Sequence, residues 1–231
     1  MRQALEGKKV AVTNEIYAIV KNQIITMQLL PGQLLLAQRI SEENGISRTP
    51  VREALVRLRE ENLLEDAGGH KFRVSEITWK LINDLYDARI AIEPFALSSV
   101  AGTITKSQVN ALKKLVHAME NCYACQDFSG FFEYDMEFHN KILDFLGNQV
   151  IKNWMIRILD QQQRIRYLTL GSESRMKNSL AEHRAIAECL ERHDAQSASD
   201  AMIAHLELSR QNVLRLKEQD HSVASRTIKN Q

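Results

Sequence analysis

The sequence contains few of the residues that interrupt regular structure. Only 9 glycines and 3 prolines occur among 231 residues, and aromatic residues make up 6%. Because turns between short strands depend on glycine and proline, this scarcity excludes a strand-rich chain and predicts a mostly helical one. Apolar residues at 44% and charged residues at 26% exclude a disordered chain. The length is sufficient for two domains of ordinary size.

Long apolar runs, a signal peptide and a paired cysteine motif are also missing. No apolar run reaches the roughly 18 residues of a membrane helix, and the first residues lack the apolar core of a signal peptide. We therefore expect a cytoplasmic protein without a membrane partner. The cysteines are Cys122, Cys125 and Cys189. A zinc ribbon would need a second C-x-x-C pair, so we expect cysteines that only pack.

The net charge of +1 excludes an argument for nucleic-acid binding from the charge of the whole chain. Any affinity for DNA must come from the local placement of basic residues, and dimerisation would double it.

A segment centred on Gly45 predicts a turn between two helices. Gly45 can adopt the left-handed backbone that ends a helix, and Ser47 is a favourable N-cap for the next helix. Pro50 is tolerated in a first turn, where backbone N–H groups have no partner within the helix. We therefore expect a short helix over 37–44 and a second helix over 48–61, which together form a helix-turn-helix.

The second of these helices has one apolar side and one polar side. Arg48 and Arg52 on the polar side can each bind guanine O6 and N7 in the major groove, and Thr49 can contact a thymine methyl group or a phosphate. The pattern alone fits an ordinary surface helix with solvated arginines equally well. The residues expected to face the core recur at helical spacing: Val51, Ala54, Leu55 and Leu58.

The segment 63–74 predicts a β-hairpin. Gly68-Gly69 is a turn signal between two short extended runs. A hairpin directly after a helix of this kind is typical of a DNA-binding wing, whose tip at Gly69, His70 and Lys71 would lie on the sugar-phosphate backbone or in the minor groove. The alternative is a loose surface hairpin.

These segments resemble the winged-helix signature of the GntR family of bacterial transcription regulators. The similarity covers about 60 residues and is strongest in Ser47–Leu55, followed by Arg57-Leu58 and Asn62-Leu63-Leu64. Two positions differ from the usual pattern, because Ala37 replaces a glutamate and Asn44 replaces a leucine.

The resemblance implies a winged helix-turn-helix domain over 13–76 that binds double-stranded operator DNA. It would consist of three helices and the hairpin wing, with Thr13 as the N-cap of the first helix. Residues 1–12 lack clear periodicity, so we expect a flexible tail that could lie on DNA. The expected DNA-binding residues are Arg39, Ser47, Arg48, Thr49, Arg52, Gly69 and His70.

From residue 77 the pattern is helical almost throughout. We expect an all-α bundle over 77–217 and a disordered tail over 218–231, which makes the fold class mostly α with an N-terminal winged helix-turn-helix. The helices are expected over 80–101, 106–125, 128–145, 149–168, 175–192 and 195–217.

Three histidines and one aspartate lie on or next to core-facing stripes of the predicted bundle. Asp135 and His139 are four positions apart, which places them on the same side of one helix. His183 and His205 lie on two later helices. Imidazole and carboxylate groups on facing helices can hold a divalent metal ion. Taken singly, each is more often a hydrogen-bonded residue than a ligand, so the pattern leaves both interpretations open.

The order of these residues is similar to that in the FCD domain of FadR-type GntR regulators. This resemblance implies that Asp135, His139, His183 and His205 hold a divalent metal ion, with Zn favoured and Ni, Mn or Fe as alternatives. It also implies effector-binding roles for Arg89 and Asn148. Arg89 would bind the carboxylate of a small metabolite, or else pair with Asp135 or Glu93.

The two halves together predict a homodimeric transcription regulator controlled by a small organic acid bound near the metal, and not an enzyme. One alternative is a metal-dependent hydrolase that activates water at the same cluster. It would need a general base, and Glu182 points about 100° away from His183 on its helix. Another alternative is a regulator that senses the metal itself. We expect four further polar residues to be solvated and assign them no role: Gln161, Gln162, Arg164 and Arg166.

Overall fold

The computed structural model describes residues 2–168, 173–215 and 227–229. The chain divides after Ile77 into two compact units, and Thr227–Lys229 belong to the first; the predicted boundary follows residue 76. The helices of the first unit are α1 (Arg2–Ile25), α2 (Ala37–Asn44) and α3 (Arg48–Glu60), and its strands are β1 (Leu34–Leu36), β2 (Leu64–Asp66) and β3 (Lys71–Val74).

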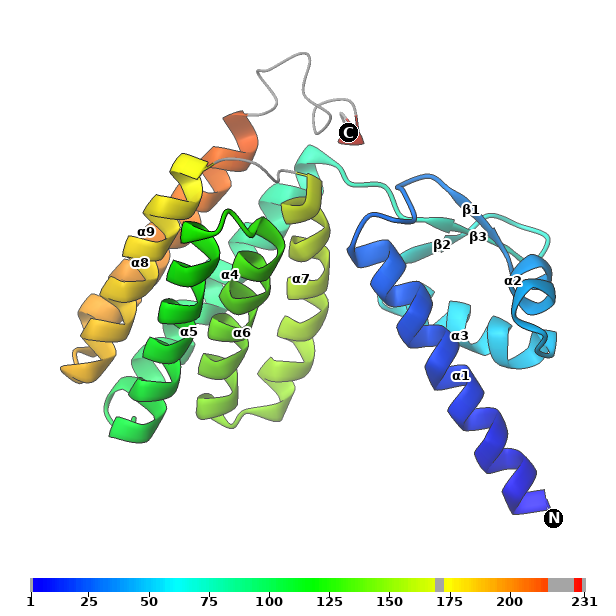
Figure 1. The fold of residues 1–231 in the computed structure, drawn as a ribbon, viewed down its shortest axis with the longest axis horizontal. Coiled ribbons are helices and arrows are strands. Elements are labelled where there is room, and N and C mark those ends of the chain that lie inside the picture. The colour runs from blue at the N-terminus through cyan, green and yellow to red at the C-terminus, as the bar shows by residue number, and fades with distance from the viewer. Residues whose placement is uncertain (1, 169–172, 216–226, 230–231) are drawn as a thin grey trace. The chain divides into compact units, whose positions relative to one another are not determined.

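The three strands form a small antiparallel sheet in the order β1-β3-β2 (Figure 1). In β3, side chains alternate between exposed and buried, so that Phe72 and Val74 face the core. Leu35 of β1 lies opposite Phe72 and is also buried. The sheet therefore closes one side of a core whose other side is formed by the three helices.

Helices α2 and α3 confirm the predicted helix-turn-helix. Gly45 has a φ of 64° and ends α2 in the left-handed conformation. Ser47 has the extended backbone of an N-cap, although its side chain makes no capping hydrogen bond. The four apolar residues expected to face the core are fully buried, namely Val51, Ala54, Leu55 and Leu58.

Helix α1 begins at Arg2, well before the predicted N-cap at Thr13. The Thr13 hydroxyl instead donates to the Lys9 carbonyl oxygen at 3.0 Å, inside the helix. The first twelve residues contain no proline, and Ala4, Leu5, Lys9 and their neighbours favour helix. Residues 2–12 are therefore helical, where the sequence analysis predicts a flexible tail.

The predicted C-terminal tail is described only over Thr227–Lys229. There, the Lys229 N–H donates to the Ile77 carbonyl oxygen at 2.8 Å, and Ile228 is buried. This short piece thus packs on its unit, where disorder is predicted. The other residues of the predicted tail beyond Arg215 lie outside the described part of the chain.

The described part of the second unit is a bundle of six helices in which consecutive helices alternate in direction (Figure 1). Thr78, Thr105 and Asp127 cap three of them with side-chain oxygens that accept backbone N–H groups. The helices lie close to their predicted ranges: α4 (Trp79–Ala101), α5 (Lys106–Ala124), α6 (Phe128–Leu146), α7 (Gln149–Leu168), α8 (Glu173–Glu191) and α9 (Ala195–Arg215).

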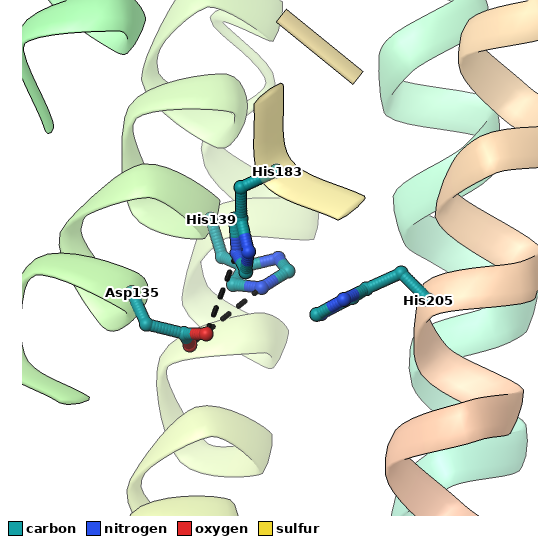
Figure 2. Close-up of side chains that lie close together, drawn as sticks. All are labelled: Asp135, His139, His183 and His205. Carbon is teal, nitrogen blue, oxygen red and sulfur yellow. Dashed lines mark ion pairs between the residues drawn. The ribbon is translucent and has the colours of Figure 1, made fainter. Parts of the chain in front are cut away.

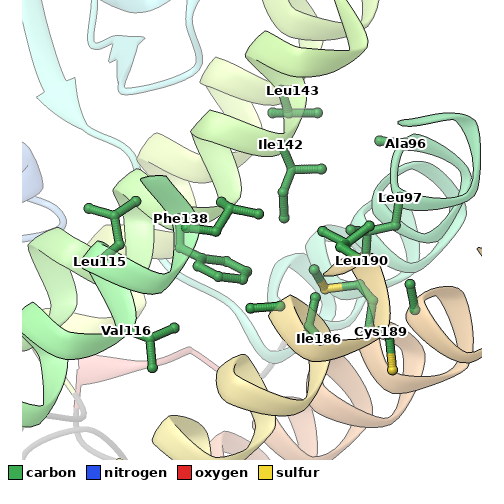
Figure 3. Close-up of a cluster of buried hydrophobic side chains, with 14 of the residues drawn as sticks. Ala96, Leu97, Leu115, Val116, Phe138, Ile142, Leu143, Ile186, Cys189 and Leu190 are labelled. Atoms are coloured by element: carbon green, nitrogen blue, oxygen red, sulfur yellow. The ribbon is translucent and has the colours of Figure 1, made fainter. Parts of the chain in front are cut away.

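Phe138 lies in the middle of the apolar core of this bundle (Figure 3). Leu115 from α5, Ile142 from α6 and Ile186 from α8 contribute to the same buried cluster. Burying each such side chain stabilises the fold by roughly 1.5–3 kcal/mol, so the helices that carry the candidate metal ligands are held by a large apolar core. None of the helices in the described residues has the length and apolar character required to span a membrane.

Candidate functional site

The structure brings Asp135, His139, His183 and His205 together inside the bundle (Figure 2). Asp135 and His139 come from adjacent turns of α6, whereas His183 comes from α8 and His205 from α9. Their donor atoms lie within 4.8 Å of one another, and each residue is at most 2% exposed. Phe138 packs edge-on against the His183 ring at a centroid distance of 4.8 Å, which ties the cluster to the core.

Each imidazole is oriented by a hydrogen bond from its Nδ1 atom. His139 Nδ1 lies 2.5 Å from Glu93 Oε2, His183 Nδ1 lies 2.7 Å from the Ser179 carbonyl oxygen, and His205 Nδ1 lies 2.7 Å from Glu182 Oε2. Carbonyl and carboxylate oxygens only accept, so Nδ1 is the donor in all three rings. The lone pair is therefore on Nε2, which is the form that binds a metal ion.

The three Nε2 atoms are buried and make no hydrogen bond within the described residues. A buried polar atom without a partner costs about 1–3 kcal/mol, so three at one point indicate a shared ligand. Three imidazole nitrogens and one carboxylate are a suitable donor set for zinc and other first-row divalent ions. The residues present thus fit a divalent metal ion.

The charge states agree with this donor set. Burial lowers the pKa of His183 to about 3 and that of His205 to about 4, although nearby carboxylates oppose the shift. Both rings are therefore neutral near pH 7. Burial alone would raise the pKa of Asp135, but Arg166, which forms an ion pair with it, holds this pKa well below its usual range. Asp135 is thus an anionic donor beside neutral imidazoles.

Arg89 is fully buried and pairs with Glu93, whose second oxygen holds His139. The Arg89 Nε atom lies 2.5 Å from Glu93 Oε1. Burial favours the neutral carboxyl, but Arg89 and His139 keep the pKa of Glu93 below its ordinary range. Of the alternatives for Arg89, the structure contains the pair with Glu93. Its Nη1 and Nη2 atoms make no hydrogen bond in the described residues.

A small cavity of about 40 Å³ adjoins Asp135. Two guanidinium groups on its wall lead to metal-ligand candidates. Arg166 pairs with Asp135, and Arg175 binds both oxygens of Glu182 at 2.7 and 2.8 Å while Glu182 holds His205. The wall is completed by residues that include Tyr86, Phe131, Ser209 and Asn212.

Asn148 has a local structural role in this fold. Its Oδ1 atom accepts the backbone N–H groups of Val150 and Ile151, both at 3.1 Å, at the start of α7. It is exposed and is not part of the cavity wall beside Asp135. The structure therefore does not bring Asn148 to the metal cluster.

Sequence reasoning missed the residues that support the cluster. Glu182 does point away from His183, but its carboxylate reaches His205 on α9. The four polar residues of α7 that were expected to be solvated are all buried: Gln161, Gln162, Arg164 and Arg166. Gln162 and Arg166 continue the buried stripe of Met155 and Leu159 at helical spacing, and this continuation was the available signal.

In the first unit, the predicted DNA-binding residues gather around the start of α3. Arg39, Arg48, Arg52, Gly69 and His70 line one groove between α2, α3 and the β2–β3 turn. All five are exposed. A groove with exposed arginines at the start of a helix can accept base edges and phosphates.

The remaining two predicted DNA-binding residues border this groove. Ser47 and Thr49 are exposed at the first turn of α3, and the Ser47 hydroxyl is not used as a cap. Gly68, Gly69 and His70 all have positive φ values, 78°, 58° and 63°, which form the tight turn of the wing.

Comparisons with known proteins agree with both units. Residues 12–74 match the family of bacterial regulatory proteins, gntR family, and residues 84–208 match the FCD domain. The HTH-type transcriptional repressor RspR of Escherichia coli (strain K12) is 25% identical over 209 residues, which cover 90% of this chain and 92% of RspR. The uncharacterised regulator YdhC of Bacillus subtilis (strain 168) is 24% identical over 192 residues, covering 83% and 86%.

A solved structure shares the whole fold. Escherichia coli McbR/YncC superposes with a TM-score of 0.76 at 20% identity, over 90% of this chain and 98% of that chain. With a helix-turn-helix and wing in the first unit and the FCD domain in the second, the chain belongs to the GntR family and is a DNA-binding transcription regulator, not an enzyme.

Proposed function

We propose that the second unit holds a divalent metal ion through Asp135, His139, His183 and His205, and that this ion is part of an effector site that controls operator binding. The observation that carries the proposal is the convergence of three unpartnered Nε2 atoms and one carboxylate within 4.8 Å. Zinc suits the donor set, and Ni, Mn or Fe are also compatible with it.

The effector that the site favours is a small organic acid. A six-coordinate ion with four protein ligands has positions left for a carboxylate. The cavity beside Asp135 carries the guanidinium groups of Arg166 and Arg175, and Arg89 has two buried nitrogens without partners in the described residues. Positive groups around a buried site select an anion, and guanidinium can bind a carboxylate through two hydrogen bonds.

On DNA, we propose that Arg48 and Arg52 reach base edges in the major groove, with Arg39, Ser47, Thr49, Gly69 and His70 contacting the backbone around them. A homodimer would place two such surfaces on two half-sites. The effector would act by binding one arrangement of the dimer more tightly than the other, since a ligand shifts an equilibrium only through such a difference.

Thermal unfolding of the purified protein tests the effector part of this proposal. A panel of small carboxylic acids is added with zinc present and after treatment with a chelator, and operator binding is measured under the same conditions. We expect at least one acid to raise the melting temperature and change operator affinity, and both effects to disappear with the chelator. If no acid acts and zinc alone changes operator affinity, the metal is the signal and the effector proposal is wrong.

A further inference from the structure

We propose that the first turns of α1, over residues 7–14, form an additional DNA-contacting surface in which Lys9 binds a backbone phosphate beside α3. Residues 7–11 precede the match to the gntR family, which begins at residue 12. The inference rests on the proposed position of α3 in the major groove, and it extends the interface beyond the helix-turn-helix and the wing.

Helix α1 is fixed firmly along α3 (Figure 1). The Tyr17 hydroxyl donates to Glu61 Oε1 at 2.7 Å, and Lys21 Nζ lies 2.9 Å from Glu61 Oε2. Arg57 donates to Asn14 Oδ1 at 2.7 Å, and its guanidinium group lies over the Tyr17 ring at 4.1 Å from the centroid. These contacts set the direction of α1 before DNA arrives.

The two helices run in the same direction. Lys9 pairs with Glu53, Asn14 with Arg57 and Tyr17 with Glu61, at separations of 43 or 44 positions. A constant separation along two packed helices requires that both run from N- to C-terminus in the same sense. The early turns of α1 therefore lie beside the N-terminal half of α3, which carries Arg48 and Arg52.

A second groove of about 740 Å³ separates these turns from α3. Val10 and Asn14 line it from α1, and Arg48, Thr49 and Arg52 line it from α3. Arg48 and Arg52 thus border both this groove and the groove on the wing side. A helix in the major groove has one phosphate backbone on each side, and the two grooves provide a place for each backbone.

Lys9 is positioned to contact the backbone on the α1 side. Its Nζ atom lies 2.6 Å from Glu53 Oε1, and the two side chains are 45% and 46% exposed. Such an exposed ion pair is weak and exchanges readily, so the ammonium group can bind a phosphate oxygen when DNA is present. A simpler role for Lys9 would be to neutralise Glu53, and this role predicts a different result.

A double-mutant cycle separates the two roles. Lys9→Gln, Glu53→Gln and the double variant are titrated by fluorescence anisotropy with a duplex that the wild-type protein selects from a random library, and with a scrambled duplex of equal length. The salt concentration is varied between about 50 and 200 mM. A direct phosphate contact predicts that Lys9→Gln lowers the slope of log K against log salt by about 0.9 per half-site, with or without Glu53.

This slope change corresponds to an affinity that is about 3.5-fold less sensitive to salt over that range for each contact. Lys9→Arg should retain the wild-type slope. The matched control is Lys113→Gln on α5, because Lys113 is 42% exposed and pairs with Glu191 at 2.7 Å; its slope should equal that of the wild type.

The proposal is overturned if Lys9→Gln leaves the slope unchanged in the Glu53→Gln background, because Lys9 would then only neutralise Glu53. Failure of the α3 assignment gives a separate signal. Arg48→Ala should bind the selected and scrambled duplexes equally; if it retains the preference of the wild type, α3 does not read the operator.

Discussion

The three histidines of the cluster are oriented by three different acceptors. Glu93 holds His139 from α4, the Ser179 carbonyl holds His183 from the preceding turn of α8, and Glu182 holds His205 from the neighbouring helix. All three leave Nε2 free to bind a ligand. The metal-binding competence of the site therefore depends on these supporting residues as much as on the ligands.

Replacing one supporting carboxylate should weaken metal binding without removing a ligand. Glu182→Gln leaves a weaker acceptor for His205 Nδ1, so we expect zinc affinity to fall by about 10- to 100-fold. Competition with a zinc-binding dye measures this change. Glu188→Gln is the control, since Glu188 is exposed on the same helix. Equal affinities of the two variants would show that the hydrogen bond has no role in metal binding.

Acidification should destabilise the metal-free protein. Burial lowers the pKa of His183 to about 3 and that of His205 to about 4, from an ordinary 6.5. The unfolded chain therefore binds these protons at a higher pH than the folded chain. The free energy of unfolding should be greatest above about pH 6.5 and should fall as the pH decreases towards 4.

Thermal melts of chelator-treated protein between about pH 7.5 and 5 test this dependence, because the carboxylates remain ionised there. His183→Gln should reduce the loss of stability. His117→Gln, which changes an exposed histidine on α5, should preserve it. A melting temperature that does not change over this range in the wild type would contradict the neutral state of the buried rings.

The sequence was sufficient to identify the four candidate ligands but not their supporting residues. Asp135 and His139 share a helix face at a spacing of four, which is visible in the sequence. The bond from Glu182 to His205 joins α8 to α9, and it depends on packing between helices that no spacing within one helix reveals. Family resemblance supplied the link among the ligands, whereas the supporting acceptors required coordinates.

At the scale of elements, helices were predictable where apolar periodicity and caps coincide. Helix α5 begins after Thr105, whose capping box with Gln108 is formed by side chains three positions apart. Helix α1 lacks such periodicity in its first turns, and its start was therefore placed too late. Those turns lie beside α3, where Asn14 and Tyr17 supply partners that a sequence-based reading does not include.

The recognition role belongs to the first turns of α3. Arg48→Ala or Arg52→Ala should remove the preference for the selected duplex at one base pair per half-site, a loss of about 1–3 kcal/mol for each bidentate contact. Gel-shift titrations measure it. Both residues are exposed, so the melting temperature should not change. Arg59→Ala, on the C-terminal half of the same helix, is the control and should bind like the wild type.

At the scale of the whole molecule, two compact units divide the work between DNA and ligand. We expect the homodimer to select an inverted repeat, with half-site centres one helical turn of about 10 base pairs apart, or a multiple of it. Selection from a random duplex library followed by sequencing measures the spacing. Enrichment of a single unrepeated half-site would contradict the dimer model.

The central claim is that one divalent ion is shared by three buried imidazoles and Asp135. Its most direct test is the metal content of the purified protein, measured by mass spectrometry for the wild type, His183→Ala and the exposed control His117→Ala. The account predicts one ion per chain in the wild type and the control, and little or none in His183→Ala. A wild-type protein that contains no metal and cannot be loaded with zinc, nickel, manganese or iron would contradict it.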